Sequence, residues 1–214
     1  MGKTRSWATR IILLFGGCFI SALCYAATIK AGLGLGPLYT VQQGVARHLH
    51  ITQGHAVMIT GAILCVIAAV LRLWPGPGTV SLPFIMGFYL DALTPHIPTM
   101  HGPFLSFVVV VAATWFMALG GALVIRGRVG AAAPDLCMLA IARRTGRSNR
   151  TVRLCMEGSW VLMGWVLGGT IGVGTVITGL LIGPALHFWI GLVGAGIPDA
   201  PTVATAERVS LGHE

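Results

Sequence analysis

The 214-residue sequence is short of charge, and above all of acidic charge. Only 9% of its residues are Asp, Glu, Lys or Arg, while 55% are hydrophobic. Soluble domains carry about 25% charged residues, so this composition argues against a water-soluble fold. The six acidic residues are outnumbered by 14 basic ones, which gives a net charge of +8. Because the basic residues lie mainly between apolar runs, membrane topology explains them better than nucleic-acid binding does.

The sequence also lacks the motifs of catalysis and metal binding. Its five cysteines form no CxxC pair and no Cys/His spacing that suits a metal, so we interpret them as buried reduced thiols. No nucleophile-base set is recognisable, and the stretch GLGLGP lacks the Lys and Ser/Thr of a phosphate-binding loop. We therefore expect no enzyme activity, no metal and no cofactor.

Long apolar runs are what the chain has in abundance. They cover residues 11–27, 56–71 and 104–125, and they approach or reach the roughly 20 residues that a helix needs to cross a bilayer. The first run, with its basic head, imitates a secretory signal. We expect an all-α polytopic membrane protein.

The sequence matches itself at an offset of 96 residues. This offset pairs Gly76, Gly78, Thr79 and Val80 with Gly172, Gly174, Thr175 and Val176, a shared GxGTV pattern, and also pairs Gly34 with Gly130 and Lys30 with Arg126. The matches predict two structural repeats, at about 11–94 and 107–190. The first apolar run then corresponds to a mid-chain helix, which argues against its cleavage as a signal. We expect one transmembrane domain over 1–198 and a disordered polar tail over 199–214.

Each predicted repeat contains a glycine-rich break after its first helix. A short segment follows (37–49; 134–145), then a long helix, then a shorter helix that begins near Thr79 or Thr175 with the threonine as N-cap. A helix from Pro37 to His48 covers roughly 18 Å at about 1.5 Å per residue, too short to cross about 30 Å of hydrocarbon. We expect six spanning helices and two re-entrant half-helices, the first beginning at Pro37.

Eight crossing segments are the alternative. With six spans and a cytoplasmic N-terminus, twelve basic residues lie inside and two outside, whereas eight spans give ten and four. The positive-inside rule favours six spans, with both termini in the cytoplasm.

Several segments in order carry a family resemblance. IKAGLGLGP, ARHLHIT, ARRTGRSNRTVR and GGTIGVGTVITGLLIGP resemble the YczE/YitT-type bacterial membrane protein family over roughly residues 11–190. The resemblance implies a small polytopic protein of the bacterial cytoplasmic (inner) membrane; a related group is classed among candidate exporters of novobiocin-type drugs. Many relatives have Gly-Pro-x-Asp after the break. Here Tyr39 stands at the acidic position and only the second half keeps the acid, Asp135, which argues against two equivalent sites.

Paired broken segments are the best sequence pointer to a transport site, although such glycines also serve helix packing. We expect a secondary transporter or exporter of an unknown small organic molecule. A channel-like pore and a non-transporting scaffold or accessory subunit are the alternatives. Membrane lipids are expected contacts, and proton coupling and homo-oligomerisation stay open.

The candidate pathway residues belong to three groups. The breaks supply Gly34, Gly36, Pro37, Tyr39 and Gly130; the helix ends before them supply Lys30 and Arg126; the ionisable residues within apolar segments are Asp91, Asp135, Glu157 and His187.

Each charged candidate has a functional and a structural interpretation. Lys30 and Arg126 either attract anions or extend to the headgroups. Asp135 either contacts a substrate or ion, or caps its helix. Asp91 either relays protons with its repeat counterpart His187, or anchors an interface beside His96. Glu157 either exchanges protons or pairs with Arg153 four residues earlier.

Overall fold

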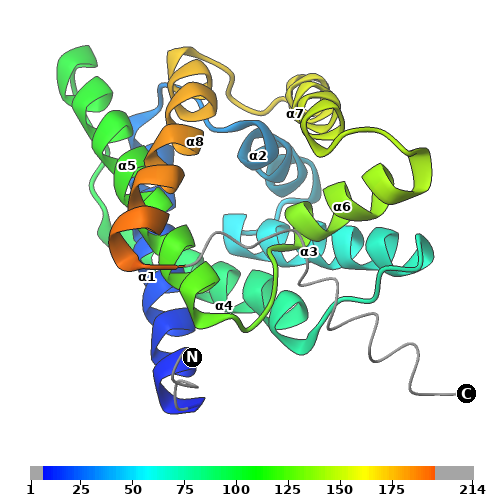
Figure 1. Ribbon diagram of the computed structural model, residues 1–214. Coiled ribbons are helices and arrows are strands. Elements are labelled where there is room, and N and C mark those ends of the chain that lie inside the picture. Colours follow the sequence, from blue (N-terminus) through cyan, green and yellow to red (C-terminus); the bar gives the residue numbers. More distant parts are fainter. Residues whose placement is uncertain (1–6, 196–214) are drawn as a thin grey trace, which may run out of the picture.

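The computed structural model describes residues 7–195, and this part of the chain contains helices and no strand (Figure 1). The helices are α1 (Trp7–Ala31), α2 (Pro37–Leu49), α3 (Gln53–Val70), α4 (Pro77–Leu93), the short 3-10 helix η1 (Thr94–His96), α5 (Pro103–Gly127), α6 (Ala133–Thr145), α7 (Asn149–Val166) and α8 (Val173–Val193). The expected all-helical class is confirmed. The polar tail 199–214 lies outside the described residues.

The helix boundaries recur along the chain. Adding 96 to both bounds of α1, α2 and α3 gives the bounds of α5, α6 and α7, and α8 begins 96 residues after α4. The caps recur as well, because Thr52 and Ser148 each accept a 3.2 Å hydrogen bond from the backbone N–H three residues later. The helix bounds therefore recur at the same offset as the sequence matches.

Four helices, α1, α3, α5 and α8, are long and apolar enough to cross a membrane. The six crossings predicted from the sequence also include α4 and α7. Helix α4 has 17 residues, and α7 carries the charged residues Arg150, Arg153 and Glu157. Large apolar side chains point outward on many helices, including Phe19, Ile63, Phe84, Phe107 and Leu180, all at least 43% exposed. Such a surface suits lipid rather than water.

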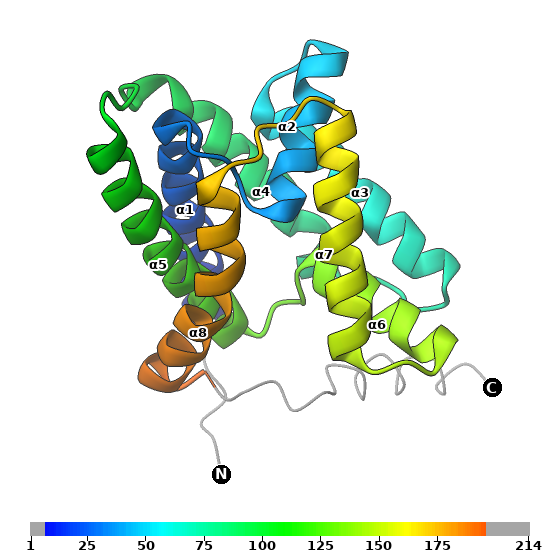
Figure 2. The same ribbon diagram turned by 90° about the horizontal axis from the view of Figure 1, so that it is seen from above.

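Each short helix packs against the opposite half of the chain. Helix α2 lies along α7, and α6 lies along α3, while α1 packs chiefly on α5 and α5 on α8 (Figures 1 and 2). Glycines allow the α2–α7 approach, since a Cβ on Gly44 would lie 2.4 Å from Cβ of Leu167 and one on Gly164 would lie 2.7 Å from Cγ2 of Thr40. No side chain fits at either position without displacing a helix.

The glycine-rich break of each half crosses the GxGTV segment of the other. The Leu33 carbonyl accepts a 2.7 Å hydrogen bond from Gly174 N–H. Gly34 has a φ of +104°, and a Cβ there would lie 2.5 Å from the Gly172 nitrogen. At the equivalent crossing, a Cβ on Gly130 would lie 2.6 Å from the Thr79 nitrogen. Each break and the GxGTV segment that it crosses can approach this closely because both have glycine at the crossing.

Three predicted helix starts need correction. Helices α4 and α8 begin two residues before Thr79 and Thr175, with Gly76 and Gly172 as N-caps, so neither threonine is the N-cap. Proline 77 explains the earlier start of α4, since its missing N–H suits the first turn. Thr175 instead accepts a hydrogen bond from Gly172 N–H inside the first turn of α8. Helix α6 begins at Ala133, one residue before its predicted start.

Replacing Gly34 with Ala should destabilise the fold by roughly 1–3 kcal/mol, because Ala is strained at positive φ and its Cβ would overlap Gly172. Gly16→Ala is the matched control, since a Cβ at Gly16 meets nothing within 4 Å. Thermal unfolding of the purified variants measures both. A Gly34→Ala protein that is as stable as Gly16→Ala would contradict the tight crossing.

Candidate functional site

Three charged side chains join α6 to α7. The Arg153 guanidinium donates from Nε to Oε1 of Glu157 at 2.7 Å and from Nη1 to Oδ1 of Asp135 at 2.7 Å. The pair predicted between Glu157 and Arg153 is present, and Asp135 joins it from another helix. One arginine facing two carboxylates leaves this triad, Asp135–Arg153–Glu157, with a formal charge of −1.

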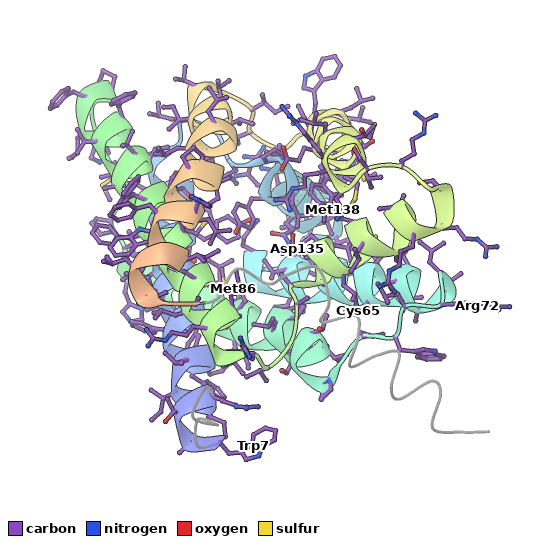
Figure 3. All side chains as sticks on the ribbon, in the orientation of Figure 1. Trp7, Cys65, Arg72, Met86, Asp135 and Met138 are labelled. Atoms are coloured by element: carbon purple, nitrogen blue, oxygen red, sulfur yellow. The ribbon has the colours of Figure 1, made fainter. Side chains whose placement is uncertain are left out.

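The triad is partly open rather than sealed in the core. Its side chains are 49% exposed at Asp135, 41% at Arg153 and 31% at Glu157. Asp135 lies at the start of α6, near the middle of the view in Figure 3. The expected capping by Asp135 is not observed, because α6 has no side-chain cap and the carboxylate binds Arg153 instead. Asp135 is the third residue of the helix, where a carboxylate still complements the helix dipole.

Tyr39 occupies the position on α2 that Asp135 occupies on α6, since 39 plus 96 is 135. Its ring stacks on Tyr25 with 4.0 Å between centroids, and its hydroxyl donates to Sδ of Met117 at 3.4 Å. Leu38, next to Tyr39, packs against the apolar cluster that contains Ala133 and Cys137 of α6. The first turns of the two short helices therefore converge on one region.

Behind the stacked rings lies a buried polar network. The Tyr25 hydroxyl, fully buried, donates to Gln42 Oε1 at 3.3 Å and accepts from Gln53 Nε2 at 2.7 Å. Gln42 Nε2 donates in turn to Oγ1 of Thr60 at 3.1 Å. The sequence analysis did not predict this hydrogen-bond network. The available signal was Gln42 and Gln53, two glutamines near apolar segments. A buried amide needs such partners, because leaving it unpaired costs about 1–3 kcal/mol.

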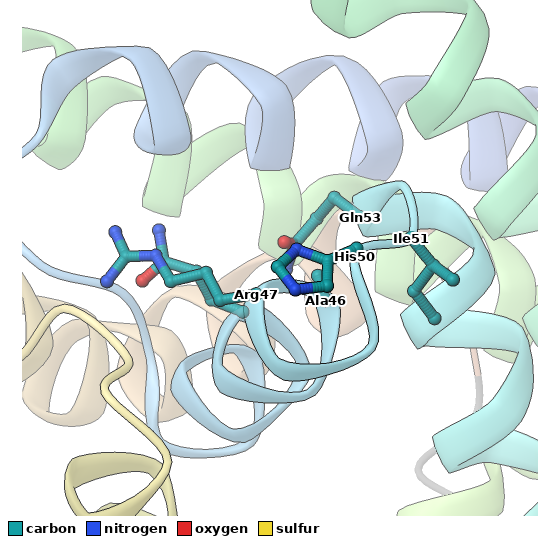
Figure 4. A pocket seen from close by; sticks show the side chains of 6 residues that line it. Ala46, Arg47, His50, Ile51 and Gln53 are labelled. Atoms are coloured by element: carbon teal, nitrogen blue, oxygen red, sulfur yellow. The ribbon is translucent and has the colours of Figure 1, made fainter.

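Gln53 connects the network to a surface pocket of about 440 Å³ at the end of α2. Arg47, His50 and Gln53 line this pocket (Figure 4). The Arg47 guanidinium donates to the Gly168 carbonyl and to Oγ1 of Thr170 at 3.2 Å. A polar line thus runs from the α2 pocket through Gln53 and Tyr25 to Tyr39, which stacks on Tyr25.

Asp91 belongs to a separate cluster at the start of α3. Its carboxylate accepts hydrogen bonds from Gly54 N–H at 2.7 Å and from the Thr52 hydroxyl at 2.5 Å, and lies 3.1 Å from Nδ1 of His55. The neighbouring His96 contacts the carbonyl of Ala92, and an interfacial anchor at this end of α4 stays a prediction. Asp91 secures the α3 N-terminus.

His187, the repeat counterpart of Asp91, is exposed and has no polar partner among residues 7–195. The Asp91 carboxylate is occupied by α3, so the structure does not join the two residues. Their proton relay has no hydrogen-bonded path in the described chain.

The remaining predicted residues lie along the breaks. Gly36 is the N-cap of α2 and Pro37 its first residue, as predicted. Lys30 and Arg126 are half-buried at the ends of α1 and α5, and neither forms an ion pair within residues 7–195. The Arg126 Nε atom is buried without a hydrogen-bond partner.

Four of the cysteines are buried, as expected, whereas Cys155 is exposed. All five are free thiols. No group of three metal-ligating side chains occurs in the described part of the chain.

The sequence matches the model of a "Family of unknown function (DUF6198)" over residues 8–191. The chain belongs to this family. It is 27% identical over 176 residues to the "Uncharacterized membrane protein YczE" of Bacillus subtilis, covering 81% of this chain and 82% of that protein. It is also 26% identical over 198 residues to an "Uncharacterized protein" of Haemophilus influenzae, covering 92% and 90%. No solved structure matches. A YczE-like membrane protein is thus the shared description, and the resemblance stated from the motifs is confirmed.

Asp91→Asn should lower the melting temperature, because Asn cannot accept from both Thr52 and Gly54 and carries no charge for the α3 dipole. The expected loss is about 0.5–2 kcal/mol, the usual worth of an N-terminal cap. His187→Gln should leave the melting temperature unchanged. Equal losses in the two variants, measured by thermal unfolding in one detergent, would show that Asp91 and His187 act together.

Proposed function

We propose that this protein is a secondary transporter that exports a small organic molecule across the bacterial cytoplasmic membrane. The observation that carries the proposal is the convergence of the two short helices: Leu38, next to Tyr39, packs against the apolar cluster of Ala133 and Cys137 on α6, where Asp135 binds Arg153. Polar groups at matching breaks in two halves are how many secondary transporters build a central site. The polar line leads from the α2 pocket as far as Tyr39.

The proposed topology has two inverted repeats, six crossings and two re-entrant half-helices, α2 and α6. Each short helix has 13 residues, or about 20 Å at 1.5 Å per residue, too short to cross alone. In Figure 2 the α6–α7 turn and the end of α8 lie on the lower side, and the α2–α3 turn lies on the upper side. This arrangement supports a re-entrant path, in which the glycine-rich break enters the membrane from one side and the short helix returns to that same side.

Unequal packing of equivalent helices favours a transporter over a channel. Helix α2 packs more extensively on α7 than α6 packs on α3, although the offset relates these two pairs. Alternating access in inverted repeats requires such an asymmetry, because one half adopts the arrangement that the other adopts in the opposite state. The stack of Tyr39 on the fully buried Tyr25 is proposed to close the path beyond the α2 pocket.

The triad supplies the proposed energy coupling. Two carboxylates share one arginine there, so the two acids have one cation between them. A carboxylate that gains a proton on one side of the membrane and releases it on the other couples the proton gradient to export. Glu157, the less exposed acid, is the proposed carrier.

The topology predicts which engineered cysteines an impermeant maleimide reaches in intact cells, in a Cys155→Ser background. His50→Cys should be labelled from outside, while Trp74→Cys and Arg147→Cys should react only after permeabilisation. With eight crossings, His50→Cys and Trp74→Cys would exchange their behaviour, and Arg147→Cys would stay inside. That pattern would overturn the re-entrant half-helices.

Export predicts that expressing the protein raises the inhibitory concentration of at least one class of toxic organic compound in a bacterial host deleted for its own exporters. Glu157→Gln should abolish this protection at unchanged membrane abundance, because the proton carrier is lost. Arg150→Gln, an exposed position seven residues before Glu157, is the control for charge loss on α7.

A purely structural role of the triad makes a different prediction. Since Arg153 also binds Asp135, the balanced neutral variant is Asp135→Asn with Arg153→Gln and Glu157→Gln. Protection restored in this triple variant would show that only charge pairing matters. If the wild type, well expressed, protects against none of the compounds and instead co-purifies with a fixed partner, the scaffold alternative replaces export.

A further inference from the structure

A second pocket, of about 350 Å³, lies where the starts of α1 and α4 meet the loop after α5. Its lining includes Trp7, Arg10, Ser81 and Arg128. Its volume falls within the range of about 300–1,000 Å³ that is usual for ligand pockets. It shares no lining residue with the polar line, so the proposed export route leaves it unused.

The pocket is built for an anion. No acidic residue lines it, and neither Arg10 nor Arg128 forms an ion pair within residues 7–195. Arg10 lies over the Trp7 ring, 5.6 Å from its centroid, which leaves the guanidinium edge for an acceptor. Two guanidinium groups can each present a pair of N–H donors to one phosphate.

The 96-residue offset shows that the two arginines are not needed to build this corner. The residues equivalent to Trp7, Arg10 and Arg128 are Pro103, Ser106 and Gly32. At the equivalent corner the N–H of Gly174 donates to a carbonyl of the other half, Leu33, at 2.7 Å. Gly78, which lines the pocket, has no such acceptor for its N–H within the described chain. The same architecture therefore exists without the charges, and the charged version leaves a backbone donor free.

We propose that this pocket binds the phosphate group of an anion, held by Arg10, Arg128 and the free N–H at the start of α4. A lipid headgroup and free phosphate share this chemistry. The Trp7 side chain, 72% exposed at the free end of α1 (Figure 3), favours the headgroup, because tryptophan concentrates at membrane interfaces. The inference is independent of transport, since it concerns a different part of the molecule.

The test uses the full chain in nanodiscs of phosphatidylcholine, titrated with phosphatidylglycerol or with inorganic phosphate. Thermal unfolding and native mass spectrometry report binding. The informative variant is Arg10→Ser with Arg128→Gly, because the other half folds with these residues at the equivalent positions and Gly suits the φ of +51° at Arg128. Arg72→Gln with Arg150→Gln removes two exposed arginines outside the pocket and serves as the matched control.

We expect phosphatidylglycerol to stabilise the wild type and the control equally, and to bind the pocket variant about fivefold more weakly for each arginine removed. Stabilisation by inorganic phosphate that disappears in the pocket variant would support the site with free phosphate as its source. Equal lipid binding by wild type and pocket variant, or an equal loss in the control, would overturn the proposal, as it would reduce the effect to general surface charge. Should the pocket variant unfold, Arg10→Ser alone gives the same comparison.

Discussion

The crossing of the two halves is the contact on which the rest of the molecule depends. The chain passes over the start of α8 with its backbone in contact, Leu33 carbonyl to Gly174 N–H, and over the start of α4 at Val129 and Gly78. Backbones approach this closely only where side chains are absent. Each crossing fixes the start of the short helix that follows, α2 or α6. The positions of Tyr39 and Asp135 are therefore consequences of glycine spacing elsewhere in the sequence.

Local patterns in the sequence were enough to predict the helices but not their partners. The offset of 96 and the apolar runs predicted the α-helical segments but not η1, because periodicity and breaks are properties of neighbouring residues. The i, i+4 spacing likewise predicted the contact between Arg153 and Glu157. Contacts between distant segments carry no such signal. The bond from Arg153 to Asp135, the Tyr25–Tyr39 stack and the Asp91–His55 contact depend on how helices cross, which a single sequence does not encode in its spacing.

The wrong N-cap assignments have the same origin only in part. Thr79 and Thr175 are good N-caps by residue type, but the N-caps are Gly76 and Gly172, and the helices begin at Pro77 and Val173. At α4 the proline favours the earlier start, whereas at α8 a Cβ on Gly172 would lie 2.4 Å from the Leu33 carbonyl oxygen of the other half. Likewise Asp135 sits where a carboxylate favours the helix dipole, yet the guanidinium of Arg153 offers a charge-assisted hydrogen bond, which is stronger than a neutral one.

The two halves share a scaffold but not a chemistry. The offset of 96 shows how the side chains differ at matching positions. It pairs Tyr39 with Asp135, Gln42 with Met138, Val57 with Arg153 and Gly61 with Glu157. Neutral hydrogen-bonding groups gather on α2, and charges gather on α6 and α7. Two equivalent binding sites are incompatible with this division. If the halves exchange their packing as the export proposal requires, the scaffold contacts exchange while these side chains stay where they are. A bound molecule would then keep the same partners throughout, and only the side from which water reaches them would change.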